Sequence, residues 1–233
     1  MRITRLGILA AITMALATSP AHAAPHQFKF LAGSGVGGWG TQVGTYKGQL
    51  DGNAIDIWCV DFANHISPGS QFQVNLTGLG GSPSLVNTRF GFYTNALARY
   101  RQAAWLAWQF TTTSQSSWKY IHAAIWHLMT PAQPSITAAS DIALVNGWLT
   151  NASTNYARYN YSNAFVITDV ALARCHATSP TGGALNGCGY QEQLTFTGPL
   201  TVTTPEPASM VLLATGLIAL TVTSRRRRKS LLR

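Results

Sequence analysis

Alternating apolar and polar residues in the first third of the chain predict half-buried β-strands. The pattern runs through residues 27–31, 55–59 and 72–76, and Cys59 shares a strand face with Ile55 and Ile57. Five glycines lie between residues 33 and 40, which predicts a flexible loop or turn at that place. The first third therefore indicates β-structure joined by turns.

The middle of the chain has helical periodicity instead. Apolar residues recur at the spacing of one helix face in residues 97–108 and 117–130, and again in a third segment that begins at residue 135 or 137 and ends at residue 150. Asn95 is expected to cap the first helix, and Pro131 is expected to stop the second. We therefore expect about three central helices.

Strand-like segments return after Asn155, at residues 164–172, 193–197 and 200–203. An order of strands, helices and strands favours an α+β fold over an alternating α/β fold. The predicted fold class is therefore α+β, with β-rich N- and C-terminal segments around the central helices.

Charge is concentrated at the two ends of the chain. The 233 residues carry a formal net charge of +9, but residues 24–224 contain eight Lys and Arg against seven Asp and Glu. A nearly neutral body lacks the basic face that binds phosphate groups. We therefore expect no nucleic-acid partner.

The N-terminus has the three parts of a secretory signal peptide in order. Two arginines precede an apolar stretch at residues 6–17, and Ala21 and Ala23 form an A-x-A cleavage site after Pro20. We expect residues 1–23 to be removed on export and an extracytoplasmic α+β domain to occupy residues 24–200.

The C-terminus predicts a membrane anchor. A stem at residues 201–207 leads into residues 208–224, which carry no charge and are near the short limit for a spanning helix. The basic tail, residues 225–233, is expected to stay in the cytoplasm, because moving Lys or Arg across hydrocarbon is costly. Its first five residues are all basic: Arg225, Arg226, Arg227, Arg228 and Lys229.

The order of these parts resembles the PEP-CTERM sorting signal of Gram-negative bacteria. The stem ends in Pro205, Glu206 and Pro207, and the apolar segment and the arginine cluster follow directly. The resemblance implies processing near these three residues by exosortase, a membrane-embedded transpeptidase-like enzyme. It also implies an exported protein of the kind often found with exopolysaccharide or biofilm matrix.

Two of the three cysteines are expected to pair. Cys175 and Cys188 flank a segment with one proline and three glycines that can turn back on itself, and disulfides form in oxidising compartments. A zinc site that uses His176 is the alternative, with at most three ligands at poor spacing. We expect no metal and no cofactor for the protein.

The third cysteine lies in a motif of its own. Trp-Cys-Val-Asp at residues 58–61 and Ala-Ala-Ile-Trp at residues 123–126 resemble the thioester (TQXA-type) domains of bacterial surface proteins. In that family a cysteine condenses with a glutamine to form an internal thioester. Here Cys59 is the matching thiol, but His122 occupies the glutamine position and has no acyl carbon. The resemblance therefore supports the fold more than the chemistry.

A second kind of chemistry is open to the same two residues. Helical geometry places His122 on the apolar side of its helix, where it could meet Cys59 as a thiolate–imidazolium pair. Asp61 or Asn64 would then have to supply the orienting third group. The alternative is that neither residue is reactive, and that Cys59 is a buried thiol and His122 a histidine of the core.

The remaining titratable residues suggest no site. Asp51, Asp56 and Asp61 are expected to be exposed, with a spacing of five that is too sparse for a calcium loop. His26 and His65 are expected to be lone and solvated. None of the glycine-rich phosphate, H-E-x-x-H or G-x-S-x-G motifs occurs in the sequence.

The sequence therefore predicts an exported surface or matrix-associated protein with a non-catalytic binding or structural role in exopolysaccharide or biofilm. Its expected partners are exosortase, the membrane through the C-terminal helix, and extracellular polysaccharide. The alternative is a Cys59-dependent protein, either a covalent thioester-like adhesin or a Cys-His hydrolase that uses Cys59 and His122.

Overall fold

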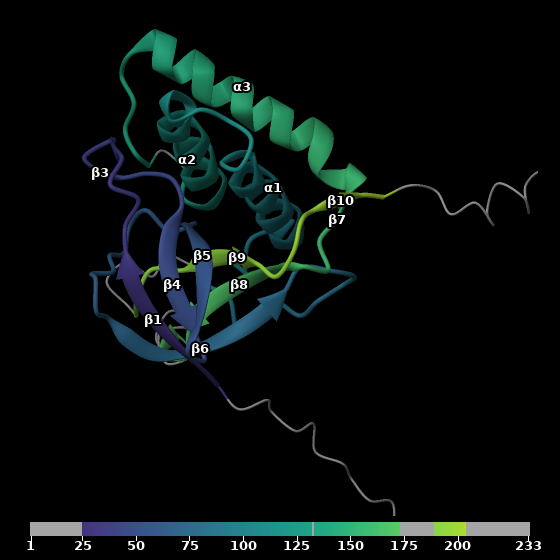
Figure 1. The fold of residues 1–233 in the computed structure, drawn as a ribbon. Coiled ribbons are helices and arrows are strands. Elements are labelled where there is room, and N and C mark those ends of the chain that lie inside the picture. Colours follow the sequence, from purple (N-terminus) through teal and green to yellow (C-terminus); the bar gives the residue numbers. More distant parts are fainter. Residues whose placement is uncertain (1–24, 132, 173–188, 204–233) are drawn as a thin grey trace, which may run out of the picture.

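The structure, a computed structural model, describes residues 25–131, 133–172 and 189–203. Three α-helices lie against a closed antiparallel β-barrel (Figure 1). In order around the barrel, the strands are β1 (His26–Ala32), β4 (Tyr46–Leu50), β5 (Asn53–Cys59), β9 (Gln193–Phe196), β8 (Ala164–Asp169) and β6 (Gln71–Gly78). The helices are α1 (Ala96–Gln109), α2 (Gln115–Met129) and α3 (Ala139–Asn155). The described residues thus have the α+β composition that the sequence predicts.

Short elements complete the described part of the chain. β2 (Gly37–Gly38) and β3 (Thr41–Gln42) form a small hairpin, so the glycine-rich segment expected to be a loop or turn is partly paired. A 3₁₀-helix, η1 (Tyr156–Arg158), follows α3 and leads into β7 (Tyr159–Asn160), which pairs with β10 (Thr201–Val202). β10 therefore returns the chain to the end of α3.

The β4–β5 hairpin was missing from the sequence prediction, which found only its second strand. Asp51 and Gly52 both have positive φ, 50° and 82°, and form a two-residue turn whose twist matches that of the strands. The Asp51 carboxylate accepts a hydrogen bond from the Gln27 N–H at 2.8 Å and lies 2.6 Å from His26 Nδ1. His26 is therefore in hydrogen-bond contact with Asp51, and the expectation that it is lone is wrong.

Buried side chains form two clusters on opposite sides of the barrel wall. One cluster fills the barrel and includes Phe28, Ile57 and Cys59 together with Trp126 from α2. The other lies between the barrel and the helices and includes Trp58. Ile57 and Cys59 therefore face one side of β5 and Trp58 the other, as the alternation predicts, and both sides are buried at this end of the strand.

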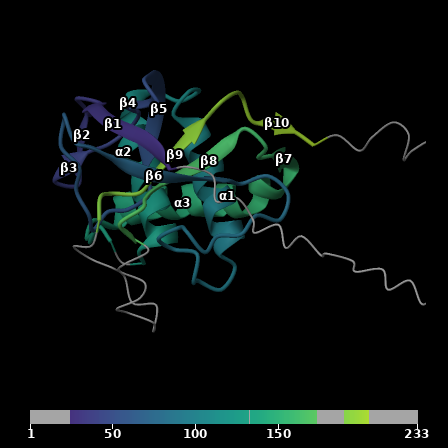
Figure 2. The same cartoon turned by 90° about the horizontal axis from the view of Figure 1, so that it is seen from below.

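The helices pack at different depths. α1 and α2 bring small buried residues together: Ala103, Ala104, Ala107, Ala123 and Ala124. In α3 only Val145 and Ala152 are buried, and this helix lies on the outside of the other two (Figure 1). Seen from below, the barrel strands cross in front of the helices (Figure 2). The apolar core therefore runs from the barrel interior through α1 and α2.

The helix limits differ from the expected ones by a few residues. α2 begins at Gln115 rather than Ser117, and α3 begins at Ala139 and continues to Asn155. Asn95 stands at the N-cap position of α1, but it has a left-handed φ of 62° and makes no side-chain capping bond. The capping prediction is wrong in that respect, because this backbone conformation does not bring the carboxamide to the free N–H groups of the first turn.

Several predicted features fall outside the described residues. Within residues 25–131, 133–172 and 189–203, no helix has the length and apolar character needed to cross a bilayer. The structure does not describe the predicted signal peptide (residues 1–23, with Ala21 and Ala23), the predicted disulfide (Cys175 and Cys188), the sorting motif (Pro205, Glu206 and Pro207), the predicted spanning helix (residues 208–224) or the basic run (Arg225 to Lys229).

Candidate functional site

Cys59 ends strand β5 inside the barrel and is fully buried. Its thiol donates a hydrogen bond to the Asp61 carbonyl oxygen at 3.1 Å and accepts one from Trp126 Nε1 at 3.4 Å. Gln193 of β9 lies directly opposite Cys59 in the sheet. Burial raises the pKa of the Cys59 thiol well above its usual value, and the Asp61 charge raises it further. The thiol is therefore held in its neutral form.

His122 lies in the middle of α2 and is also fully buried. Its Nδ1 accepts a hydrogen bond from the Gly44 N–H at 2.9 Å, so Nε2 carries the proton and donates to the Cys59 carbonyl oxygen, also at 2.9 Å. The ring stacks on Trp126 with centroids 4.2 Å apart. Burial lowers the pKa of His122 to about 3, so the imidazole is neutral.

The structure thus brings Cys59 and His122 together, as the position of His122 on the apolar side of its helix suggests. The contact, however, joins the imidazole to the backbone carbonyl of Cys59 and not to its thiol. Both ring nitrogens are occupied by backbone groups, and neither side chain is in its charged form. The arrangement matches a core histidine that links three segments, and a thiolate–imidazolium pair has no support in it.

The glycine-rich segment, residues 33–44, packs against the start of α2 next to His122. The backbone of Gly44 approaches Trp118 so closely that a Cβ there would lie 2.3 Å from the indole ring. Trp39, at the tip of the β2–β3 hairpin, donates from Nε1 to the Lys119 carbonyl oxygen at 2.8 Å. The hairpin is therefore fastened to the first turns of α2, and His122 lies beneath it.

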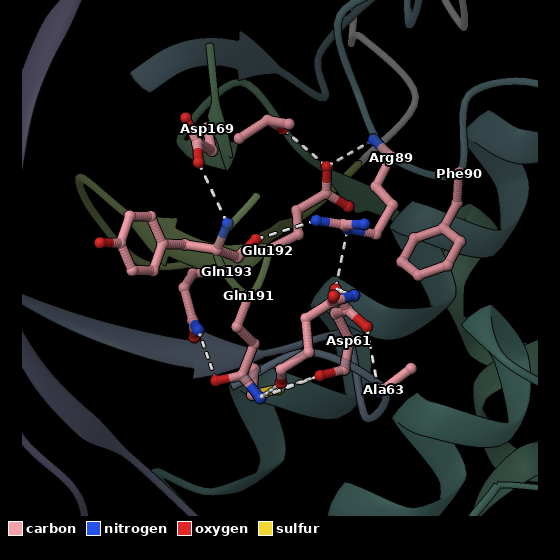
Figure 3. A network of polar contacts seen from close by, with 12 residues as sticks. Asp61, Ala63, Arg89, Phe90, Asp169, Gln191, Glu192 and Gln193 are labelled. Carbon is pink, nitrogen blue, oxygen red and sulfur yellow. Dashed lines mark hydrogen bonds and ion pairs between the residues drawn. The ribbon is translucent and has the colours of Figure 1, made fainter. Parts of the chain in front are cut away.

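Asp61 belongs to a buried ion pair beside this site (Figure 3). Arg89 Nε lies 2.8 Å from Asp61 Oδ2, and the two side chains are 2% and 1% exposed. The carboxylate also accepts hydrogen bonds from Asn64 Nδ2 at 2.7 Å and the Ala63 N–H at 3.1 Å. The expectation that Asp61 is exposed is wrong, because the loop after β5 folds inward to meet Arg89. Asp56 remains exposed.

Glu192 is a second buried carboxylate in the same network. Its Oε1 accepts hydrogen bonds from the Arg89 N–H at 2.7 Å and the Thr168 hydroxyl at 2.6 Å, and its Oε2 accepts one from the Tyr100 hydroxyl at 2.6 Å. Burial raises the pKa of Glu192 to about 7, although these donors act in the opposite direction. The network therefore joins the residue before strand β9 to strand β8, helix α1 and the segment before α1.

Two glutamines extend the network toward Cys59. Gln191 Nε2 donates to the carbonyl oxygens of Asp61 and Asn64, at 2.9 and 3.0 Å, and Gln191 Oε1 accepts from Gln193 Nε2 at 2.9 Å. Gln193 is fully buried, and its Oε1 has no hydrogen-bond partner among the described residues. Figure 3 shows both carboxamides beside the Asp61 loop.

Sequence reasoning missed Arg89, Glu192 and the two glutamines. The local sequence carried little signal, because charged residues are mostly exposed and neither charge lies inside an apolar stretch. Arg89 precedes Phe90, and Glu192 lies just before a strand. Nothing in the spacing indicated that these two residues meet.

The described residues contain no candidate metal site. No three or more of their His, Cys, Asp or Glu side chains form a group that could hold a metal ion. The zinc alternative with His176 lies outside the described residues.

Among the hollows on the surface of the described residues, two are relevant here. A small one of about 150 Å³ lies at the barrel mouth and includes Tyr46, His65 and Gln191 in its lining. A larger one of about 630 Å³ runs across the helices and is called the helical groove below. Its lining residues are Thr94, Asn95, Ala98, Arg99, Gln102, His127, Leu128, Pro131, Leu149 and Tyr156.

Comparison with known families identifies the C-terminal segment. Residues 203–228 match the family described as PEP-CTERM protein-sorting motif. The chain therefore carries a PEP-CTERM sorting signal, the signal of an exported protein that is anchored in the membrane before exosortase processes it. The sorting-signal prediction is confirmed on this segment.

The comparisons identify no family for the rest of the chain. No curated protein and no solved structure matches it. The resemblance of the core to thioester domains therefore stays a prediction. It depends on the two short motifs and on the proximity of Cys59 and His122.

Proposed function

We propose that the chain is a non-catalytic binding or structural protein of the extracellular matrix of a Gram-negative bacterium, delivered to the cell surface through its sorting signal. The single observation that carries this proposal is the PEP-CTERM match at residues 203–228. It assigns export and exosortase processing, and the character of the described domain supports the rest.

The buried chemistry of the domain supports a non-catalytic role. A nucleophile must reach its substrate, and Cys59 is sealed inside the barrel with its thiol neutral. His122 has no free nitrogen with which to accept a proton, and it offers no acyl group for a thioester. The Cys59-dependent alternatives therefore need an opening of the hairpin that covers His122.

The surface of the domain supports a hydroxyl-rich partner that is recognised through hydrogen bonds. Residues 24–224 are close to neutral, and the outer face of α3 presents exposed hydroxyl and amide groups at Thr150, Asn151, Ser153 and Thr154. The Ser153 and Thr154 hydroxyls donate to the Thr150 carbonyl oxygen, so towards a partner they offer acceptors, beside the side chains of Thr150 and Asn151. They suit the hydroxyl-rich chains of an exopolysaccharide.

Processing provides the first test. Glu206→Gln, and separately deletion of residues 225–229, should leave a longer, unprocessed species in the membrane fraction on an immunoblot. The matched control is Asp56→Asn, which removes one carboxylate charge from the exposed barrel surface. Normal processing of both sorting-signal variants would contradict the proposal.

Location provides the second test. The processed protein should be recovered with the extracellular matrix fraction of producing cells, and it should be missing from that fraction when exosortase is absent. Recovery only from the periplasm or only from the inner membrane would exclude the matrix role.

Thiol reactivity separates the Cys59-dependent alternatives from this proposal. We expect Cys59 in the folded protein to resist iodoacetamide, with alkylation only after unfolding, because the thiol is buried and protonated. Peptide mass mapping identifies the modified residue. Rapid alkylation of Cys59 in the folded state would favour a reactive thiol instead.

A further inference from the structure

The lining residues of the helical groove come from three helix segments: the start of α1, the end of α2 and the second half of α3 with the residue after it. Its volume of about 630 Å³ is within the range of roughly 300–1,000 Å³ that is usual for ligand sites. Gln102, His127 and Tyr156 in its lining are half-buried, so the groove is a shallow, open hollow. The groove therefore has the size to hold a segment of an extended ligand.

Several polar side chains of the groove have no partner. Among the described residues, no hydrogen bond involves the Thr94 hydroxyl, the carboxamides of Asn95 and Gln102, or the Tyr156 hydroxyl. His127 donates from Nε2 to the Pro134 carbonyl oxygen at 3.1 Å, which leaves Nδ1 as an acceptor. The groove thus combines neutral donors and acceptors in one place, as a ligand with many hydroxyl groups requires.

The only charge in the lining of the groove, among the described residues, is positive. Arg99 is its one charged residue among those described, and none of its lining residues is Asp or Glu. Arg99 is fixed in place, since it donates from Nη1 to the Leu128 carbonyl oxygen at 2.7 Å and lies 4.7 Å from the centre of the Tyr93 ring. Its other N–H groups remain free to bind a carboxylate.

We infer that the helical groove binds a segment of an acidic polysaccharide, with Arg99 at a uronate carboxylate and Gln102 and Tyr156 at the sugar hydroxyls. Leu149 and the Tyr156 ring supply apolar surface for the faces of the sugar rings. The inference depends on the proposed matrix function, because it names the ligand and the site through which the protein joins the matrix.

The test measures binding of polygalacturonate, an acidic polymer, and of dextran, a neutral one, to the full chain in a polyoxyethylene detergent by titration calorimetry. Polygalacturonate should bind, with an affinity that falls as salt is added, and dextran should bind at least several-fold more weakly. Gln102→Ala and Tyr156→Phe should each weaken binding of polygalacturonate by about three- to tenfold, the loss of one hydrogen bond.

Charge is tested by a matched pair of variants. Arg99→Met should weaken polygalacturonate binding by about tenfold or more. Lys29→Met, which removes the same charge from the exposed side of β1, should not change it. Gln102→Ala and Tyr156→Phe remove groups with no partner in the fold, so their result stands even where Arg99→Met is less stable.

Three results would overturn the inference: no binding of polygalacturonate, equal binding of dextran, or unchanged affinity in both Gln102→Ala and Tyr156→Phe. These results differ from a failure of the proposed function. A protein that still reaches the matrix fraction with both groove substitutions retains its proposed function and loses only this site. A wild-type protein that never reaches that fraction lacks the function itself.

Discussion

Burial keeps two titratable side chains of the core, His122 and Glu192, neutral over opposite pH ranges. Burial lowers the pKa of His122 from 6.5 to about 3, so its contribution to stability is present above 6.5 and is lost as the pH falls toward 3. Burial raises the pKa of Glu192 from 4.5 to about 7, so its contribution is present below 4.5 and is lost as the pH rises through 7. Between 4.5 and 6.5 the two effects oppose each other.

Single substitutions should expose each effect. In His122→Gln, the free energy of unfolding should rise as the pH falls from about 7 to about 4.5, because only Glu192 remains. In Glu192→Gln, it should fall as the pH drops below 6.5, because only His122 remains. Each slope should be about 1.4 kcal/mol per pH unit, measured by urea unfolding across the range. Parallel pH profiles for the two variants would refute the assignment of the slopes to these two residues.

The buried ion pair is a second feature at the residue scale. Arg89→Met leaves the Asp61 carboxylate buried without its ion-pair partner, so the free energy of unfolding should drop by about 3–5 kcal/mol. The control, Lys47→Met, breaks an exposed ion pair with Asp56 and should cost less than about 1 kcal/mol. Urea midpoints of the two variants measure the difference. Equal losses would show that burial of the pair is not what makes it important.

Sequence reasoning found the position of His122 but missed its neighbours for a physical reason. The 3.6-residue repeat fixes which side of one helix faces the core, so the burial of His122 follows from local spacing. The partners of Asp61 and Glu192 come from segments far away, as the separation of 130 residues between Gln191 and Asp61 shows. No local pattern encodes such a meeting, and Asp61 was placed on the surface as a result.

At the scale of elements, the glycine-rich hairpin depends on close contact with α2. Gly44→Ala places a Cβ 2.3 Å from the Trp118 ring at a residue whose φ is +108°, so the free energy of unfolding should fall by about 2–4 kcal/mol. Gly35→Ala is the control, since its φ of +74° carries similar strain but its Cβ meets no atom within 4 Å. That change should cost about 1 kcal/mol. Equal urea midpoints for the two variants would show that the contact with Trp118 is unimportant.

The same hairpin illustrates which elements a pattern predicts. Long periodic helices and alternating strands were found, because each is defined by its own residues. β2, β3 and β4 were missed, since they are short or contain glycine, and their strand geometry comes from pairing with a neighbour. Barrel closure was also missed, because the pairing of β5 with β9 joins the first and last parts of the domain.

At the scale of the whole molecule, the sequence predicts how the chain is oriented across the membrane. Residues 24–224 have little net charge, whereas eight of the 16 Lys and Arg residues lie before residue 24 or after residue 224. Charges next to apolar segments set orientation across a membrane, because Lys and Arg resist transfer through hydrocarbon. The distribution of charge therefore predicts a domain outside and a basic tail inside.

Reporter fusions test this orientation. Alkaline phosphatase, which needs an oxidising compartment, should be active when fused after Thr203 and silent when fused after Arg233. β-Galactosidase, which needs the cytoplasm, should show the reverse. Removal of residues 2–23 is the matched control and should silence phosphatase at Thr203. Active β-galactosidase at Thr203 in the intact chain would place the domain in the cytoplasm. In that case neither exosortase processing nor binding of an extracellular polysaccharide in the helical groove could occur.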